Sequence, residues 1–485
     1  MVKDGVTRIP CPLRSAATLS PDAPAIVGAG GALRFGELDR RVSVAAARIR
    51  ELGLGAEDRV ALYLPKDEGY FVLLLALIRA QCVACLLSTR LPPRGAAPLP
   101  ERIGCCAIVS RSEDLLEMTG VSALRPENLL PDEVAPDQPQ PTGELWLAPD
   151  QPSTIVFTSG STSVPKAALH TFGNHFFSAQ GSNANIALVP GDRWLHSLPL
   201  YHVGGLSILF RCLLAGAAVA WAEPGAPLGE AIADGGATHV SLVSTQLSRL
   251  LREKDFEKGR LKAILLGGGP MPLSLVDEAA ARRLPVHTSY GLTEMASQVT
   301  ATPPEASREE LRTSGRPLPH REVSISEAGE IMVRGETLFS GYVRNDAVDR
   351  SLDANGWFHT GDLGELDDEG YLLVRGRKDN LFISGGENVQ PEEIEQALCR
   401  LDGVDDAVVV PVPDTEFGFR PVAFVRMAGV SASAETLARA LERTLPRFKV
   451  PVSFYGLPEE AGSMKVDRAS LRERARRLHR QSDRA

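Results

Sequence analysis

Cysteine is scarce in this sequence, and long apolar segments without charge are missing. The chain has seven cysteines in 485 residues, and this odd, small number does not suit a disulfide framework. The longest apolar stretch, 203–222, carries Arg211 near its middle, which a lipid-facing helix would tolerate poorly. Residues 1–14 carry charges and lack the apolar centre of a signal peptide. We therefore expect a reduced, cytoplasmic protein that does not enter a membrane.

An excess of basic residues is also missing. Acidic residues outnumber basic ones by 61 to 52, which gives a net charge of -9. This balance argues against binding to nucleic acid or to a membrane surface. It does not exclude a small anionic ligand, because single well-placed cations decide that. The sequence leaves open whether the chain forms a homo-oligomer.

The pair Cys82-x-x-Cys85 is the one cysteine pattern that resembles a redox or metal site. No second pair follows at a spacing that zinc would need, and leucine-rich sequence lies on both sides. Small buried hydrophobic residues are the better interpretation.

The residues that are present are typical of a globular protein with more than one core. Hydrophobic residues make up 44% of the chain and charged residues 23%. A single core rarely exceeds about 300 residues, so two or more domains are expected. Helical and strand patterns alternate over 33–87, and this alternation favours an α/β fold with largely parallel sheets covered by helices. Further buried strands are predicted near 154–158, 238–243 and 262–266.

Other regions have different patterns. Residues 88–150 are rich in proline and aspartate with weak periodicity, which predicts a long surface loop. After about residue 320 the strands become short and separated by turns, which favours antiparallel pairing. The last hundred residues read as a separate βαβ-like unit: a helix start at 390–393, strands at 407–412 and 422–427, and a helix at 434–445.

The strongest local signal follows the apolar strand 155–157. Hydroxyl groups and backbone N–H groups on a flexible loop that ends in a lysine suit a polyphosphate. The loop is not a Walker A motif, because G-x-x-x-x-G-K-[ST] is absent. A plain surface loop is the alternative. The residues of this candidate phosphate loop are Thr158, Ser159, Gly160, Ser161, Thr162, Ser163, Val164, Pro165 and Lys166.

Several glycine-rich turns downstream also carry polar side chains. Each one alone is typical of an ordinary turn, but their order and spacing together are specific. They are Gly267-Gly268-Gly269, the segment Ser289-Tyr290-Gly291-Leu292-Thr293-Glu294, Asp362 after Gly361, Arg377 after Gly376, Gly385-Gly386-Glu387, and Lys465 after Gly462.

These motifs, from about residue 33 to 465, resemble those of the adenylate-forming superfamily, which includes acyl-CoA synthetases, nonribosomal adenylation domains and luciferases. Within it, segments 197–205, 213–216 and 379–387 are similar to the o-succinylbenzoate–CoA ligase family of menaquinone biosynthesis. The resemblance implies a large N-terminal domain (1–378) of two helix-covered sheets and a small β-barrel-like subdomain. It also implies a small, mobile α+β C-terminal domain (379–485), joined by a hinge at Asp379.

The resemblance further implies a two-step reaction with ATP, Mg²⁺ and CoA. A carboxylate attacks the α-phosphorus of ATP to give an acyl-adenylate and pyrophosphate, and the CoA thiol then displaces AMP. In this scheme the phosphate loop holds ATP, Glu294 binds magnesium and Thr293 contacts phosphate. Asp362 and Arg377 hold the ribose, whereas Gly267 to Gly269, Ser289, Tyr290 and Gly291 border the adenine. Lys465 bridges the carboxylate and the α-phosphate, a role that suits a mobile cation.

Other residues are implied to face the acyl substrate and CoA, and two of them have plainer alternatives. His202 with Gly204 is implied to gate the acyl pocket, although it could be a satisfied core histidine. Arg211 would meet the second carboxylate of a dicarboxylic keto acid, or else find a structural partner or reach solvent. Thr245 would add a polar contact, and Gly385 and Gly386 would line the CoA tunnel. Ser163 departs from the glycine usual in the family, so a slightly altered loop is expected.

Overall fold

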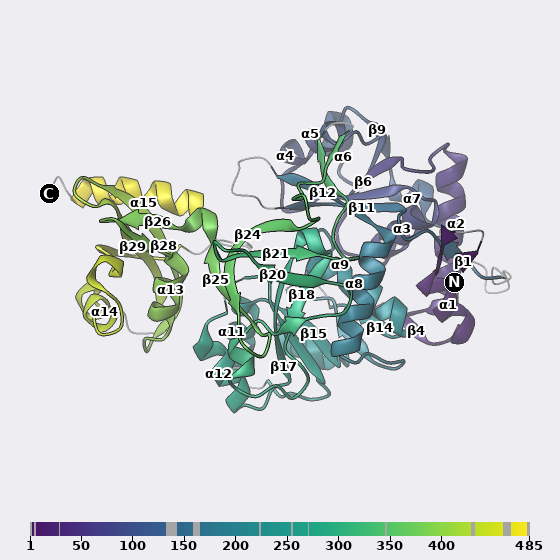
Figure 1. The fold of residues 1–485 in the computed structure, drawn as a ribbon. Coiled ribbons are helices and arrows are strands. Elements are labelled where there is room, and N and C mark those ends of the chain that lie inside the picture. Colours follow the sequence, from purple (N-terminus) through teal and green to yellow (C-terminus); the bar gives the residue numbers. More distant parts are fainter. Residues whose placement is uncertain are drawn as a thin grey trace.

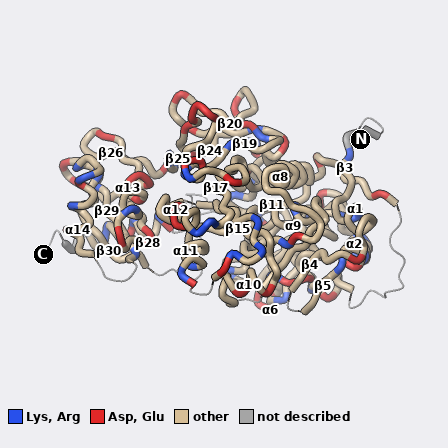
Figure 2. The backbone as a smooth tube through the Cα atoms, turned by 90° about the horizontal axis from the view of Figure 1, so that it is seen from below, with Lys and Arg blue, Asp and Glu red and all other residues tan. Residues whose placement is uncertain are grey.

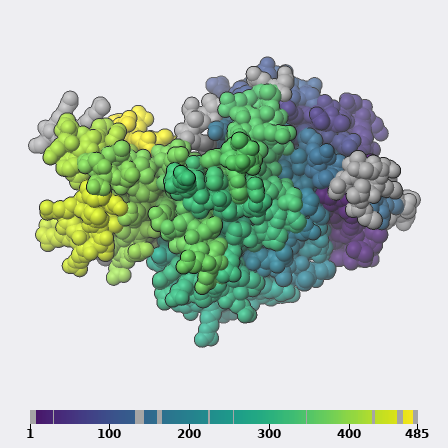
Figure 3. Space-filling model, viewed as in Figure 1, coloured from purple at the N-terminus to yellow at the C-terminus, as the bar shows by residue number. Residues whose placement is uncertain are grey.

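The structure is a computed structural model that describes residues 2–3, 6–28, 30–131, 143–158, 165–222, 225–253, 256–269, 271–344, 347–427, 432–458 and 467–482. Figure 1 shows a large lobe, which contains the elements as far as β25, and a smaller lobe formed by the elements from β26 onward. The space-filling view separates the same two lobes (Figure 3). Basic and acidic residues are interleaved over both lobes (Figure 2), in keeping with the modest net charge.

The first sheet of the large lobe has eight strands. Its centre is parallel, and antiparallel strands extend it on the side of β12. In spatial order the strands are β23 (Ala347–Asp349), β22 (Gly341–Arg344), β12 (Lys166–Thr171), β11 (Pro152–Thr158), β7 (Val83–Leu86), β6 (Arg59–Tyr63), β8 (Ala107–Ser110) and β9 (Ser122–Leu124).

The second sheet has nine strands and the same plan of a parallel centre with antiparallel edges. In spatial order the strands are β19 (Arg316–Pro317), β18 (Ser297–Ala301), β17 (Val286–Leu292), β16 (Ala263–Leu266), β15 (His239–Leu242), β13 (Arg193–Leu195), β14 (Ala218–Ala220), β4 (Pro24–Gly28) and β5 (Gly31–Arg34).

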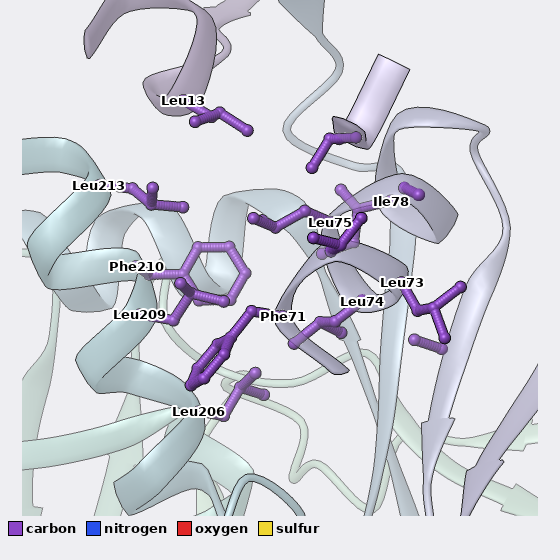
Figure 4. Packing of buried hydrophobic residues seen from close by; sticks show 14 of the residues in the cluster. Leu13, Phe71, Leu73, Leu74, Leu75, Ile78, Leu206, Leu209, Phe210 and Leu213 are labelled. Carbon is purple, nitrogen blue, oxygen red and sulfur yellow. The ribbon is translucent and has the colours of Figure 1, made fainter. Parts of the chain in front are cut away.

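Helices α3 (Glu68–Arg79) and α9 (Val203–Ala215) form the centre of the large lobe. Both are apolar around nearly their whole circumference, as is typical of a helix buried in a core. Figure 4 shows Phe71 of α3 close to Leu206 and Phe210 of α9, within one continuous hydrophobic cluster. Arg211, which α9 also carries, is therefore held in apolar surroundings.

The other helices of the large lobe lie outside this pair. They are α1 (Pro12–Leu19), α2 (Phe35–Glu51), α4 (Pro93–Ala96), α5 (Pro98–Arg102), α6 (Glu113–Met118), α7 (Pro126–Leu129), α8 (Phe172–Asn185), α10 (Leu228–Asp234), α11 (Ser244–Arg252) and α12 (Leu273–Ala281).

A smaller third sheet completes the large lobe and stands where the barrel-like subdomain was expected. It is antiparallel throughout. Its strands are β20 (Glu322–Ile325), β21 (Glu330–Arg334), β24 (Phe358–Leu366) and β25 (Leu372–Arg377).

The small lobe is an α+β unit that packs around one long antiparallel pair, β28 and β29. Strand β30 lies parallel to β29 and follows it by way of α14, which makes one βαβ unit. The two predicted strands, 407–412 and 422–427, instead pair with each other in the antiparallel sense. Arg252 on the large lobe pairs with Asp405 at 2.6 Å between the lobes. The elements are β26 (Phe382–Ser384), β27 (Glu387–Val389), α13 (Pro391–Cys399), β28 (Val404–Asp414), β29 (Gly418–Met427), α14 (Ala434–Leu441), β30 (Ser453–Gly456) and α15 (Arg468–Ser482).

The region 88–150, in which a long surface loop was expected, is more regular than the sequence indicated. Its described part contains four short helices and strands β8 and β9 of the first sheet, and residues 132–142 lie outside the described residues. Helices of four to six residues are too short to show helical periodicity in a sequence window.

The cysteines behave as expected. All seven lie in the described part of the chain as free thiols, and Cys82 and Cys85 are fully buried. Burial raises the pKa of the Cys82 thiol to about 12, so the thiol stays protonated and unreactive. Among the helices that the structure describes, none is both long and apolar enough to cross a bilayer.

Candidate active site

The turn after β17 places the first group of predicted site residues. Strand β17 ends, one 3-10 turn follows (Thr293–Met295), and the chain reverses into β18. The reversal needs glycine at 291, where a Cβ atom would lie 2.3 Å from the carbonyl oxygen of Ser297. The polar side chains of this turn are therefore held at the carboxyl end of a central strand, where open α/β sheets bind ligands.

Tyr290, Asp362 and Arg377 meet in one hydrogen-bonded group. Asp362 and Arg377 face each other across β24 and β25. Arg377 Nη1 donates to Asp362 Oδ1 over 3.0 Å, and the Tyr290 hydroxyl donates to Oδ2 over 2.6 Å. Burial and the nearby carboxylate raise the pKa of Tyr290, so its phenol remains a donor. The carboxylate of Asp362 keeps further lone pairs for the hydroxyl groups of a ligand.

The glycine turn at 267–269 approaches the same group. The Ser289 hydroxyl donates to the carbonyl of Leu266 over 3.0 Å, at the end of β16. A Cβ atom on Gly267 would lie 2.5 Å from Ser289 Oγ, and Gly268 has φ of +82°. Glycine is thus required for the backbone to pass this close, and the turn leaves a flat surface of main chain.

The two ends of the candidate phosphate loop lie beside Glu294. Thr158 and Lys166 are opposite each other on β11 and β12, and Ser159, Gly160, Ser161, Thr162 and Ser163 between them fall outside the described residues. Lys166 Nζ lies 4.8 Å from the centre of the Tyr342 ring. The Tyr342 hydroxyl in turn donates to Glu294 Oε1. A phosphate-loop cation and the predicted magnesium ligand are therefore joined through a tyrosine that the sequence did not reveal.

A buried histidine, His170, binds the main chain of the turn that contains Thr293 and Glu294. His170 Nε2 lies 2.7 Å from the carbonyl oxygen of Thr293. Burial lowers the pKa of His170 to about 4, so the ring is neutral and this nitrogen carries the proton that it donates. The contact holds the main chain between Thr293 and Glu294 in place.

Arg211 is one of the most deeply buried charged side chains in the described part of the chain, with an exposure of 1%. Nη2 donates to the Ser297 hydroxyl over 3.0 Å, and the guanidinium lies 5.0 Å from the Trp194 ring. Nε and Nη1 have no hydrogen-bond partner among the described residues. Burial lowers the pKa of Arg211 to about 10, which still leaves it charged at neutral pH.

This geometry excludes one alternative for Arg211, because the side chain does not reach solvent. Ser297 and Trp194 are structural partners, but no carboxylate within the described ranges pairs with the guanidinium. A buried cation with two unused donors is costly unless an anionic ligand or another acceptor meets it.

A cavity of about 360 Å³ lies where strands from both sheets end. Thr245 lines it, as does Tyr201, whose ring centre is 4.8 Å from that of the neighbouring His202. Arg211 is not part of this lining, so the structure does not bring Thr245 to Arg211 there. His202 itself is the N-cap of α9, and Gly204 lies in the first turn of that helix.

The lining of this cavity also contains residues that sequence analysis missed. Lys66 and Arg90 follow β6 and β7, and Arg249 lies on α11; no acidic residue joins them in the lining. Burial lowers the pKa of Lys66, whose Nζ donates to the carbonyl of His196 over 2.8 Å. None of these three residues belongs to a motif in the sequence. Only the position of Lys66 and Arg90 directly after predicted parallel strands could have marked them as candidate ligand-binding residues.

The predicted residues of the small lobe are partly described. Asp379 accepts a hydrogen bond from Arg377 Nη2 over 3.4 Å in the connection between the lobes. Gly385 and Gly386 have φ of +60° and +87° in the tight turn between β26 and β27. Lys465 falls outside the described residues.

No group of three or more His, Cys, Asp or Glu residues within the described ranges is arranged to hold a metal ion. A magnesium ion with one protein carboxylate and several phosphate oxygens does not need such a group. Glu294 suits that arrangement, because it is a hard oxygen ligand of which the Tyr342 hydrogen bond uses one oxygen.

Comparisons with known proteins show the family of this chain. The model of the AMP-binding enzyme family matches residues 13–343, and that of the AMP-binding enzyme C-terminal domain matches 393–461. The 2-succinylbenzoate–CoA ligase of Bacillus licheniformis is 35% identical over 455 residues, which cover 91% of this chain and 95% of the relative. That of Salmonella typhimurium is 42% identical over 327 residues, 67% of this chain and 69% of the relative.

Solved structures give the same result. The o-succinylbenzoate CoA synthetase of Bacillus subtilis in complex with the acyl-adenylate intermediate OSB-AMP has a TM-score of 0.86 at 31% identity, covering 96% of this chain and 98% of that one. The same enzyme in complex with ATP and magnesium ion has a TM-score of 0.83 at 32% identity, with coverages of 93% and 96%. This chain therefore belongs to the AMP-binding enzyme family and, within it, to the 2-succinylbenzoate–CoA ligases.

Proposed function

We propose that this chain joins o-succinylbenzoate to coenzyme A in two steps at the expense of ATP. In the first step, an oxygen of the succinyl carboxylate bonds to the α-phosphorus of ATP and pyrophosphate leaves. In the second, the CoA sulfur bonds to the acyl carbon, the thiol proton is lost to solvent, and AMP leaves. The observation that carries the choice of substrate is Arg211, a buried cation with unused donors that suits the second carboxylate of a diacid.

In this proposal the group around Asp362 holds the nucleoside. The carboxylate accepts the ribose hydroxyls while Tyr290 and Arg377 fix its orientation. Gly267 to Gly269, with Ser289 and Gly291, offer main chain for the adenine to lie against.

Thr158, Lys166 and the residues between them hold the phosphates, with Thr293 beside them. Glu294 would bind Mg²⁺, which neutralises phosphate charge when it is bound. Lys465 approaches as a cation and stabilises the charge that develops as the carboxylate attacks, and no general base is required because the carboxylate is already ionised.

We assign the approach of CoA to the cavity near His202. CoA carries several phosphate groups, and three cations but no acid line the cavity: Lys66, Arg90 and Arg249. His202 and Gly204 then separate the acyl pocket from the thiol, and Thr245 contributes a polar group to the wall. For the second step the small lobe turns about Asp379, so that Gly385 and Gly386 replace Lys465 at the site.

The proposal includes domains at 1–378 and 379–485, a cytoplasmic location and no nucleic-acid or membrane partner. Whether the chain forms a homo-oligomer does not affect it.

Pyrophosphate release tests the proposed function. We expect release with o-succinylbenzoate but not with benzoate or octanoate, and AMP and an acyl-CoA only when CoA is added. Equal rates with all three acids would refute the choice of substrate and leave the ligase class intact. ATP binding without pyrophosphate release for any acid would refute the enzymatic function altogether.

A further inference from the structure

A second arginine is buried near Arg211, and the proposed function does not use it. Arg321 has an exposure of 6% and lies between β19 and β20. Nε donates to the carbonyl of Pro319 over 3.0 Å, Nη1 to that of Gln298, and Nη2 to that of Ser178 over 3.3 Å. Its acceptors are main-chain carbonyls, and no carboxylate among the described residues pairs with it.

Helix α8 has a matching gap for this guanidinium. A Cβ atom on Gly181 would lie 2.4 Å from Arg321 Nη2 and 2.6 Å from the carbonyl oxygen of Pro319. Glycine inside a helix weakens it relative to alanine. The helix thus carries an unfavourable residue where the guanidinium lies against it.

Arg321 and Arg211 hold neighbouring residues of β18. Arg321 binds the main chain of Gln298, and Arg211 binds the hydroxyl of Ser297. Ser297 also contacts the hydroxyl of Ser207 on α9 at 3.2 Å. The position of Ser297, and with it one donor of Arg211, therefore depends on where Arg321 fixes the strand.

The two guanidiniums also share a region of low polarity. Burial lowers the pKa of Arg321 to about 9, and repulsion from the Arg211 guanidinium acts in the same direction. The side-chain Nε2 of Gln298 is buried without a partner among the described residues, as are Nε and Nη1 of Arg211. The Glu336 carboxylate offsets part of the charge at Arg321. Two buried cations and three unused donors still leave this region with a positive potential, which favours an anionic ligand.

We propose that Arg321 is a positioning residue for acyl-substrate specificity: it anchors β18 at Gln298 so that Ser297 and Arg211 meet the second carboxylate of the substrate, and its charge favours that anion. This inference rests on the proposed function, since it concerns the same diacid. Arg321 does not itself touch the substrate, because its donors are already used by main-chain carbonyls.

The test compares two acids in the pyrophosphate-release assay. o-Succinylbenzoate has the ring carboxylate, and benzoylpropionate has the same keto-acid side chain without it. The variants are Arg321→Met, which removes the charge, and Arg321→Lys, which keeps the charge but not the forked geometry. Arg282→Met, an exposed arginine on the surface of the large lobe, is the matched control.

We expect Arg321→Met to lower kcat/KM for o-succinylbenzoate by on the order of tenfold, mainly through KM, and to change that for benzoylpropionate by less than about twofold. Arg321→Lys should restore part of the preference. In an Arg211→Met background, Arg321→Met should have no further effect on the ratio between the two acids. The control should match the wild type with both acids.

Equal losses with both acids would overturn the inference, because a merely structural role lowers activity without regard to the ring carboxylate. If Arg321→Met does not fold, Arg321→Lys decides, and an unchanged ratio in that variant overturns the inference. A wild-type enzyme that does not prefer the diacid would refute the proposed function itself. A preference abolished by Arg211→Met but kept by Arg321→Met and Arg321→Lys would refute the role of Arg321 alone.

Discussion

Replacing Arg211 by methionine is expected to impair catalysis far more than it changes the stability of the fold. The guanidinium has one side-chain hydrogen bond, to Ser297, and one ring contact, to Trp194. Losing these costs about 1 kcal/mol for the hydrogen bond and about 1–2 kcal/mol for the cation–π contact. Removing a buried charge without a counter-ion in favour of an apolar group gains about 1–4 kcal/mol. The free energy of unfolding should therefore change by no more than about 2 kcal/mol in either direction.

Activity should fall by more than any change in stability explains. A substrate carboxylate buried without its cation loses about 3–4 kcal/mol, which corresponds to a fall in kcat/KM on the order of 10²- to 10³-fold. Pyrophosphate release with o-succinylbenzoate measures this fall, and urea unfolding of the same sample measures stability. Arg282→Met, which removes an exposed arginine, should leave both unchanged. If Arg211→Met lost about 2 kcal/mol of stability and kept full activity, Arg211 would be a structural residue and the reasoning would be refuted.

Three further predictions concern other parts of the chain. Tyr290→Phe removes a 2.6 Å hydrogen bond to the carboxylate of Asp362, which we propose holds the ribose of ATP. KM for ATP should therefore rise on the order of tenfold in steady-state assays, and an unchanged KM would contradict the proposed role of Asp362. Arg468→Met leaves the buried Glu395 carboxylate without its ion pair. The free energy of opening of β28, measured by amide hydrogen exchange, should therefore fall by about 3–5 kcal/mol, while that of β17 in the large lobe should not change. Burial lowers the pKa of His170 to about 4 and that of His196 to about 3, so on acidification the unfolded chain binds these protons first. Below about pH 6.5, each of the two should therefore remove about 1.4 kcal/mol of stability per pH unit, and urea unfolding that is independent of pH between about 7.5 and 5 would contradict their neutral, buried state.

Long, regular elements were predictable because their pattern is local. The helix Phe35–Glu51 and the helix that starts at Pro391 have apolar periodicity and clear end signals, and both are present. The short helices of the region 88–150 were not predicted because they are shorter than the window in which periodicity is visible. Sheet order was not predictable, since it joins segments such as β14 and β4 that are distant in the chain.

The residues of the candidate site also fall into those that the sequence predicted and those that it did not. Tyr290 and Asp362 were recognisable because each belongs to a short segment of glycine and polar residues that are adjacent in the sequence. The structure places the two in strands β17 and β24 and joins them by a hydrogen bond. Tyr342, Ser297 and Arg321 were missed because nothing in their own surroundings in the sequence marks them. Their importance comes from partners far away, as in the contact between Tyr342 and Glu294, 48 residues apart.

The sequence by itself determined the family and, through it, the use of ATP. The motifs that carry this resemblance are short segments, so their residues and their order can be seen directly in the chain. It also marked Arg211 as a charge in an apolar stretch. Only the tertiary structure decided that, among the described residues, this cation has no carboxylate partner and Ser297, 86 residues away, is its one side-chain hydrogen-bond partner. It also decided that a second arginine binds the same strand at Gln298. The physical reason is that the cost of a buried charge depends on everything packed around it, and packing brings together residues whose separation along the chain carries no such information.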